Sequence, residues 1–436
     1  MSFQGATIVA APNEFKAPFP PFVQISKVQF QKEGGSRLLA VSGWDGTCRV
    51  YEVGKLGEIS EKLVYTHGKP LLTCTFAGYN KVACAGVDHN VKLVDIDTGY
   101  GSQLGSHALA VRCMEFNPIS SVVVTGGWDS AVKLWDARSY GNGAIESVTV
   151  SNSVYAMDVL KHTILVGTKD RKIYMYDSRK MRDPLQVRDS PLKYQTRAVQ
   201  FFPSGEAFVV SSIEGRVAVE YVDQTGDQVK RKYAFKCHRE KEADGTELIH
   251  PVHAVSFHPK YGTFATGGAD GIVNIWDPFN RKRIIQLHKF DTSISSLSFN
   301  EDGTQLAIAS SYQYEHEVEP TTLPNNTITI RHITDPESRP KLFQMPAGDY
   351  PTIGEYAEAQ KKLGSCLPEF RATMVKSLQI GTTFGVPFGF YVAWRQHGTH
   401  LKPFLGKSLA TWLTSTLTFA CLGLMGGTYN CLRIKF

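Results

Sequence analysis

Cysteine is scarce in this chain and follows no metal-binding or redox pattern. There are eight cysteines in 436 residues, and no two of them stand in a C-x-x-C pair. Cys74, Cys84 and Cys113 lie in apolar runs typical of strands, where a buried and reduced thiol is expected. The spacing argues against a metal site or a disulfide framework and favours a reducing compartment.

Other signals are also missing. The first residues lack the basic start and long apolar core of a secretory signal, so none is predicted. Of the net charge of +6, residues 342–436 carry most, since nine lysines and arginines stand there against four acidic residues. The preceding part is nearly neutral, which argues against counterion-driven nucleic-acid binding. No patterned nucleophile or dinucleotide motif is present, so we expect neither an enzyme nor a cofactor.

What the chain does contain is a repeat. A tight turn with an acidic residue, a short apolar strand and a bulky residue recur along it, most clearly in GGWDSAVKLWD at 126–136. The bulky residues recur about every 41 to 45 positions, with one interval of about 55, the spacing of WD40 units. They are Tyr51, Val94, Trp135, Tyr176, Tyr221 and Trp276, with a divergent seventh copy ending near Ile330. The prediction is an all-β, seven-bladed WD40 propeller.

In the second and third blades a histidine opens the unit and an aspartate lies in its last turn. We interpret the pairs His67 with Asp88 and His107 with Asp129 as structural hydrogen bonds within each blade. The predicted division of the chain is an irregular lead-in at 1–22, the propeller at 23–341, a linker with a short helix at 342–377 and two apolar helices at 378–436. Polar insertions at 237–250 and 311–326 are expected to form surface loops.

Several unusual strings resemble one WD40 family. Four segments are similar to the Bub3/Rae1 family, and their sequences are nearer to its Bub3 branch. They are KYQTR at 193–197, SSIEGRVAVEY at 211–221, YAFKCHR at 233–239 and FATGGADGIVNIWDPFNRKR at 264–283. The resemblance covers residues 14–341. It implies a non-enzymatic scaffold of the spindle-assembly checkpoint that acts at kinetochores in the nucleus, with a cytoplasmic pool. The alternative within the family is a Rae1-like adaptor of nuclear pores and messenger export.

The resemblance also implies partners and residues. Propellers of the Bub3 branch bind the GLEBS segments of Bub1 and BubR1/Mad3 and the phosphorylated MELT repeats of Knl1. Arg216 and Arg239 match the positions that contact phosphothreonine, and a planar guanidinium suits phosphate. In a WD40 protein of another family, an arginine at the place of Arg216 is more often a solvated loop residue. The positions implied for the partner segment are Trp44, Trp128, Tyr194, Arg197 and Glu214.

The tail departs from the family pattern, because typical members end near the equivalent of Lys341. Two uncharged stretches, 378–394 and 409–429, approach the length of a bilayer span and predict a helical membrane hairpin at 378–429. The alternative is a pair of helices that packs on soluble partners. Such a tail is either the product of a fusion with an adjacent gene or a membrane tether, and the tether would make this a membrane-bound WD40 protein.

Overall fold

We analysed a computed structural model of the chain. It describes residues 13–32, 34–55, 57–139, 141, 143–224, 231–242, 244–314, 324–340, 367–397, 407–418 and 420–421. The chain divides into two compact units, Met1–Phe343 and Gln344–Phe436.

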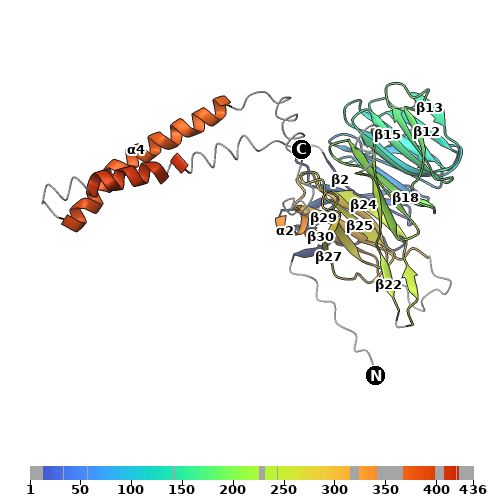
Figure 1. The fold of residues 1–436 in the computed structure, drawn as a ribbon. Helices are drawn as coiled ribbons and strands as arrows, with labels where there is room; N and C mark the ends of the chain where they lie inside the picture. The colour runs from blue at the N-terminus through green and yellow to red at the C-terminus, as the bar shows by residue number, and fades with distance from the viewer. Residues whose placement is uncertain are drawn as a thin grey trace. The chain divides into compact units, whose positions relative to one another are not determined.

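The first unit is a propeller of seven four-stranded antiparallel sheets (Figure 1). Blade one contains β2 (Ile25–Phe30), β3 (Leu38–Gly43), β4 (Thr47–Val53) and β5 (Ile59–Thr66), and blade two contains β6 (Leu71–Phe76), β7 (Lys81–Gly86), β8 (Asn90–Asp95) and β9 (Gly101–Ser106). Blade three contains β10 (Val111–Asn117), β11 (Val122–Gly127), β12 (Ala131–Asp136) and β13 (Glu146–Thr149). Blade four contains β14 (Val154–Leu160), β15 (Thr163–Thr168), β16 (Lys172–Asp177) and β17 (Gln186–Asp189).

Blade five contains β18 (Thr196–Phe201), β19 (Ala207–Ser212), β20 (Arg216–Tyr221) and β21 (Tyr233–Lys236). Blade six contains β24 (Val252–Phe257), β25 (Phe264–Gly268), β26 (Val273–Asp277) and β27 (Lys282–Gln286). Blade seven combines β28 (Ile294–Phe299), β29 (Gln305–Ser310) and β30 (Thr327–His332) with β1 (Glu14–Lys16), and the short helix α2 (Asp335–Ser338) follows it. The predicted seven-bladed propeller is therefore confirmed.

The first strand of each blade lies innermost, and these strands contact one another around a ring that closes between β28 and β2. Each blade is apolar on both faces, so its residues are buried against the neighbouring blades. All seven inner strands run in the same direction through the ring. We call the rim where they begin the upper rim, with the turns 44–46, 128–130 and 213–215, and the rim where they end the lower rim, with the turns 31–37, 78–80 and 117–121.

The ring is closed by strands from the two ends of the propeller. Glu14–Lys16, which the sequence analysis placed in an irregular lead-in, forms β1 and pairs antiparallel with β30 in the register Glu14 with Arg331. The guanidinium of Arg331 lies 2.6 Å from carboxylate oxygens of both Glu14 and Glu337. All three side chains are largely buried, so charge pairing holds the last blade together.

The two predicted histidine–aspartate pairs are present. His67 Nε2 lies 2.9 Å from Asp88, and His107 Nδ1 lies 3.0 Å from Asp129. In blade three the chain of hydrogen bonds continues, because Trp135 Nε1 donates to Thr125 Oγ1, which lies 2.7 Å from His107 Nε2. Every polar atom of this chain is satisfied with His107 neutral, so the pair is structural.

These histidines predict how stability depends on pH. Burial lowers the pKa of His67 and of His107 in the folded protein. Below about pH 6.5 these histidines take up protons in the unfolded chain, while in the folded chain they stay neutral down to a lower pH. The stability that comes from keeping these histidines neutral is therefore fully present above that pH. It is lost as the pH falls towards the pKa values of the two histidines in the folded protein. In urea titrations between pH 7 and 5 we expect the free energy of unfolding to fall by up to about 1.4 kcal/mol per pH unit for each histidine.

The double variant His67→Asn with His107→Asn tests this expectation. Both variants remove a titrating ring, so the slope of stability against pH should become shallower even where the variant is less stable at pH 7. An identical slope in the variant and the parent chain would contradict the assignment.

The second unit contains the long helix α4 (Leu367–His397), which begins within the predicted linker and has Pro387 inside it. Residues 407–418 are also helical, and Thr416 Oγ1 lies 3.5 Å from the carbonyl oxygen of Gly381. The short helix predicted within 342–377, in YAEAQKKLGS, lies outside the described residues, and so does the part of the second apolar stretch that follows Cys421.

The predicted membrane hairpin is not supported. Among the described residues of the tail, no helix is long and apolar enough to cross a membrane. The uncharged stretch of α4 has the necessary length, but Gln379, Thr382, Thr383 and Pro387 and its glycines dilute its apolar character. The membrane hairpin was predicted from the absence of charged residues, which is not sufficient for a membrane span.

Candidate peptide-binding sites

The first candidate site is built on the upper-rim turn of blade five. Arg216 is the first residue of β20 and pairs with Ser212 on one side and Lys236 on the other. The preceding residue, Gly215, has φ +60°, and a Cβ there would lie 2.9 Å from the carbonyl oxygen of Cys237. Only glycine fits this turn, which fixes where the side chain of Arg216 begins.

Arg239 reaches the same turn from the other side. Its Nη2 donates to the carbonyl oxygen of Glu214 at 2.9 Å, and its Nε donates to that of Gly215 at 3.3 Å. Arg216 Nε lies 3.7 Å from the carboxylate of the same Glu214. The two arginines predicted to contact phosphate therefore meet at one residue, on one rim of the propeller.

The two guanidinium groups differ in how fully they are paired. The side chain of Arg216 is 39% exposed, whereas its Nε is buried and has no hydrogen-bond partner among the described residues. Arg239 is only 12% exposed, and its Nη1 donates to Glu247 at 2.8 Å. That contact, with Lys236 nearby, holds the pKa of Glu247 below its usual value. An incoming anion thus meets Arg216 directly and competes with Glu247 for Arg239.

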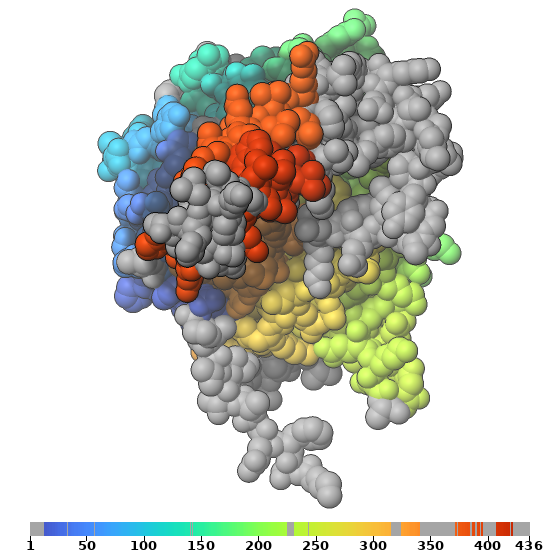
Figure 2. Space-filling model, turned by 60° about the vertical axis from the view of Figure 1, so that its left-hand side comes forward, coloured from blue at the N-terminus to red at the C-terminus, as the bar shows by residue number. Residues whose placement is uncertain are grey.

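Glu247 belongs to a small hairpin that is not part of any blade. Its strands are β22 (Arg239–Lys241) and β23 (Glu247–Ile249), which pair antiparallel between blades five and six. The hairpin stands out from the propeller in Figures 1 and 2, where its residues are coloured yellow-green. The insertion expected to form a surface loop at 237–250 thus contains a two-stranded sheet, and Arg239 is its first residue.

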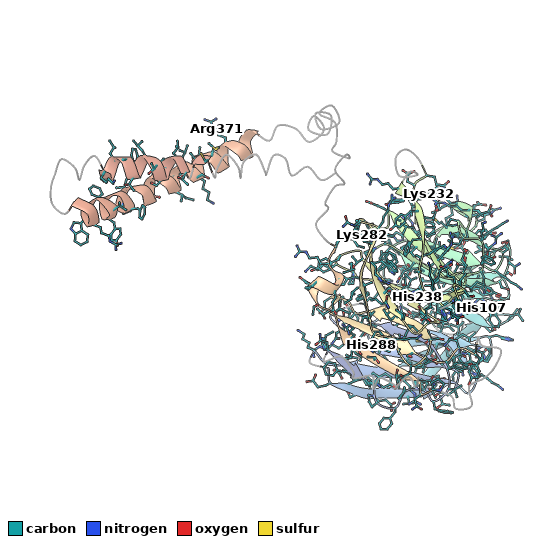
Figure 3. All side chains as sticks on the ribbon, turned by 60° about the horizontal axis from the view of Figure 1, so that its bottom comes forward. His107, Lys232, His238, Lys282, His288 and Arg371 are labelled. Atoms are coloured by element: carbon teal, nitrogen blue, oxygen red, sulfur yellow. The ribbon has the colours of Figure 1, made fainter. Side chains whose placement is uncertain are left out.

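A third histidine–aspartate pair anchors this hairpin, and the sequence analysis missed it. His238 Nδ1 lies 2.9 Å from Asp270, and its Nε2 lies 2.8 Å from Thr266 Oγ1, to which Trp276 Nε1 also donates. Figure 3 labels His238 and His107 within the body of the propeller. The signal was the same as in blade three, namely a histidine before the blade and an aspartate in the turn before its last strand. It was missed because the insertion separates His238 from the rest of blade six. Because His238 directly precedes Arg239, this buried pair positions the arginine.

The second candidate site is a cavity of about 610 Å³ at the upper-rim opening of the central channel. Trp44 and Trp128, each 39% exposed, lie in its wall, and Arg197 also lines it. Aromatic and arginine side chains dominate the binding energy of most peptide interfaces. Three of the five residues predicted to contact a partner segment are therefore gathered here.

Bulges in the inner strands direct side chains into this cavity. In every inner strand the register shifts after the first residue, as between Val111 and Cys113, which leaves one residue unpaired. Such bulges turn a side chain away from the ladder. The residues at these register shifts that line the cavity are Ser26, Leu72, Arg112, Arg197, His253 and Ser295. Sequence reasoning missed Arg112 and His253, because a bulge leaves no periodic signal.

The other two predicted residues lie elsewhere. Glu214 accepts a hydrogen bond from the backbone N–H of Lys193 at 3.0 Å, which ties the turn of blade five to the loop before β18. Tyr194, in that loop, is 57% exposed. Neither lines the cavity. Both belong to the surface around Arg216, so the predicted contact set is divided between two neighbouring sites.

Comparison with known proteins gives the family. The model of the WD domain, G-beta repeat, matches residues 101–136 and 246–277. The chain is 87% identical over 341 residues to a mitotic checkpoint protein, bub-3, of Caenorhabditis elegans, a match that covers 78% of this chain and 99% of that protein. It is 42% identical over 335 residues to the mitotic checkpoint protein BUB3.1 of Arabidopsis thaliana, covering 75% and 96% of the two chains.

More distant similarity extends to export factors. The chain is 32% identical over 328 residues to a poly(A)+ RNA export protein of Schizosaccharomyces pombe, covering 74% of this chain and 91% of that one. The chain is thus more similar to the checkpoint protein, at 87% identity, than to the export protein, at 32%. This agrees with the sequences of the fifth and sixth blades, which resemble the Bub3 branch. The chain belongs to the Bub3 family of WD40-repeat mitotic checkpoint proteins.

Proposed function

We propose that this protein is a non-enzymatic adaptor of the spindle-assembly checkpoint that joins two peptides. One is a GLEBS segment of Bub1 or BubR1/Mad3, and the other is a phosphorylated MELT repeat of Knl1. By holding both, it recruits checkpoint proteins to kinetochores, which places it in the nucleus with a cytoplasmic pool. The observation that carries the proposal is the meeting of Arg216 and Arg239 at Glu214.

The blade-five site suits a phosphothreonine. A phosphate carries about two negative charges at neutral pH and three acceptor oxygens, and two guanidinium forks supply the matching donors. Arg216 offers donors that are partly exposed, whereas Arg239 offers those left after its bonds to Glu214 and Gly215. Because backbone carbonyls hold Arg239 in place, little side-chain entropy is lost when phosphate binds.

The channel cavity suits the second peptide. Trp44 and Trp128 provide apolar area, and Arg112 and Arg197 provide donors. A segment with acidic side chains would bind across the opening with its charges above the arginines. Because the cavity and the blade-five site share none of these side chains, one partner segment and one phosphopeptide can be held at the same time.

The double variant Arg216→Ala with Arg239→Ala tests the proposal. Losing charge-assisted hydrogen bonds from two arginines costs about 3 kcal/mol, so calorimetry should show about a hundredfold weaker binding of a phosphorylated MELT peptide. GLEBS peptide binding should persist. The matched control is Arg179→Ala, since Arg179 is exposed and pairs only with Asp177 two residues away. Unchanged phosphopeptide affinity in the double variant would exclude the role of this site.

Two further results sharpen the test. Glu247→Gln should bind the phosphopeptide more tightly than the parent chain, because it removes the carboxylate that competes for Arg239. The Rae1-like alternative, which the similarity to export proteins favours, predicts that a native pull-down recovers a nucleoporin and none of the checkpoint proteins. That outcome would replace the checkpoint role with one in nuclear export.

A further inference from the structure

The opposite end of the central channel carries a second cavity, of about 210 Å³, on the lower rim. The ends of four inner strands and the turns that follow them form it. Its walls are mainly apolar side chains, namely Phe30, Phe76, Phe116, Pro118, Val159 and Leu160. This volume accommodates one or two large side chains rather than a cofactor-sized molecule. None of the residues that match the family's peptide contacts lies here.

The turns around this cavity are fixed by hydrogen bonds. Gln31, which is 2% exposed, donates from Nε2 to the carbonyl oxygens of Gly78 at 2.7 Å and Tyr79 at 3.2 Å. Asn117, which is fully buried, donates to the carbonyl oxygen of Lys161 at 2.7 Å. The opening is therefore formed before any partner binds, which reduces the entropy lost on binding.

One buried acceptor lines the cavity without a partner. Gln31 Oε1 is shielded from solvent and accepts no hydrogen bond from any described residue. A buried carbonyl without a donor is unfavourable. Because solvent does not reach this oxygen, a bound chain would contact the apolar walls and the lysines and not Gln31 Oε1.

The charge around the opening is positive. Lys32 and Lys161 line the cavity, are exposed, and take part in no ion pair with a described residue. The acidic side chain that also lines it, Glu115, is already engaged by Lys27 at 2.6 Å and by Gln29 at 3.1 Å. The two lysines are therefore available to acidic groups outside the cavity.

Large apolar side chains extend this surface beyond the cavity. Tyr79, on the turn held by Gln31, is 72% exposed, and Ile119, on the turn held by Asn117, is 60% exposed. Isolated apolar side chains are common on protein surfaces, but these two flank an apolar cavity. They enlarge the area that a bound chain can cover.

From these observations we propose that the lower-rim cavity is a second peptide-docking site. Its occupant is a short segment of a partner protein in which one large apolar residue is flanked by acidic residues. The apolar side chain fills the cavity, and the flanking carboxylates pair with Lys32 and Lys161. Because this site lies on the opposite rim from the two proposed above, it adds a third partner without competing with them.

The test uses the full chain and a defined probe. The probe is a fluorescein-labelled peptide with one phenylalanine between two glutamates on each side, followed by fluorescence polarisation. We expect saturable binding that Lys32→Glu with Lys161→Glu weakens at least about tenfold. A probe with lysines in place of the glutamates should bind the charge-reversed variant and not the parent chain. Replacing the phenylalanine by serine should abolish binding in both cases.

The controls separate this site from the others. Trp44→Ala with Trp128→Ala, and Arg216→Ala with Arg239→Ala, should leave probe binding unchanged. Absence of saturable binding to the parent chain, or binding that survives the charge reversal or the serine substitution, would overturn the proposal. It would also be overturned by sedimentation data showing a dimer that the Lys32→Glu, Lys161→Glu variant dissociates, because the occupant would then be a second copy of this chain.

Discussion

Replacing Arg331 by alanine is expected to lower the free energy of unfolding by about 3–5 kcal/mol. The guanidinium contacts Glu14 and Glu337 at 2.6 Å each, and the side chain of Glu14 is only 3% exposed. Burial opposes the charge of Arg331, but the two carboxylates outweigh it and raise its pKa. Without the arginine, two buried carboxylates lose the full positive charge between them, and His288, 3.5 Å from Glu14, is the basic side chain left beside that carboxylate among the described residues. Urea titration at pH 7 measures the loss.

The matched control is Arg138→Ala. Arg138 also makes a close ion pair, at 2.9 Å to Asp136, but its side chain is 71% exposed. We expect little or no change there, because solvent screens an exposed ion pair. If both substitutions cost the same, the closure of the ring would not depend on the buried triad of Glu14, Arg331 and Glu337.

Trp135→Ala is the second substitution with a large expected effect. Trp135 is 2% exposed and packs between blades two and three, against Leu93, Leu104 and Met114. Its ring lies so close to Gly105 that a Cβ there would be 2.2 Å from it. Truncating a buried aromatic side chain of this kind costs about 3–5 kcal/mol, and the cavity would separate two blades.

Trp135→Phe divides this effect into packing and hydrogen bonding. Phenylalanine keeps most of the apolar contact but cannot donate to Thr125 Oγ1, so the expected loss is about 1–3 kcal/mol. The phenylalanine variant should therefore be less destabilised than the alanine variant in urea titrations. Equal stability of the alanine variant and the parent chain would show that the blade interface does not depend on this ring.

The blades were predictable because their signals are local. Each unit repeats a tight turn, an apolar strand and a bulky residue such as Trp135 or Trp276, and these determine strand, turn and burial within about 40 residues. The pairs His67 with Asp88 and His107 with Asp129 could be predicted for the same reason. The third pair was missed, since the β22–β23 hairpin separates His238 from the rest of its blade.

The candidate sites were predictable only in part. Family resemblance selected Arg216 and Arg239, but their meeting depends on the carbonyl oxygens of Glu214 and Gly215, which no side-chain pattern reveals. Arg112 and His253 reach the upper cavity through bulges. The lower cavity combines the ends of strands from four blades, so its residues are far apart in the sequence.

The pairing of β1 with β30 has a consequence for synthesis. Glu14–Lys16 leave the ribosome more than 300 residues before their partner strand, β30. During translation six blades can form while β1 still has no strand to pair with. The unpaired strand edge of the incomplete seventh blade can meanwhile pair with other chains. The nascent polypeptide therefore needs either a chaperone or rapid synthesis to avoid pairing with other chains until His332 has left the ribosome.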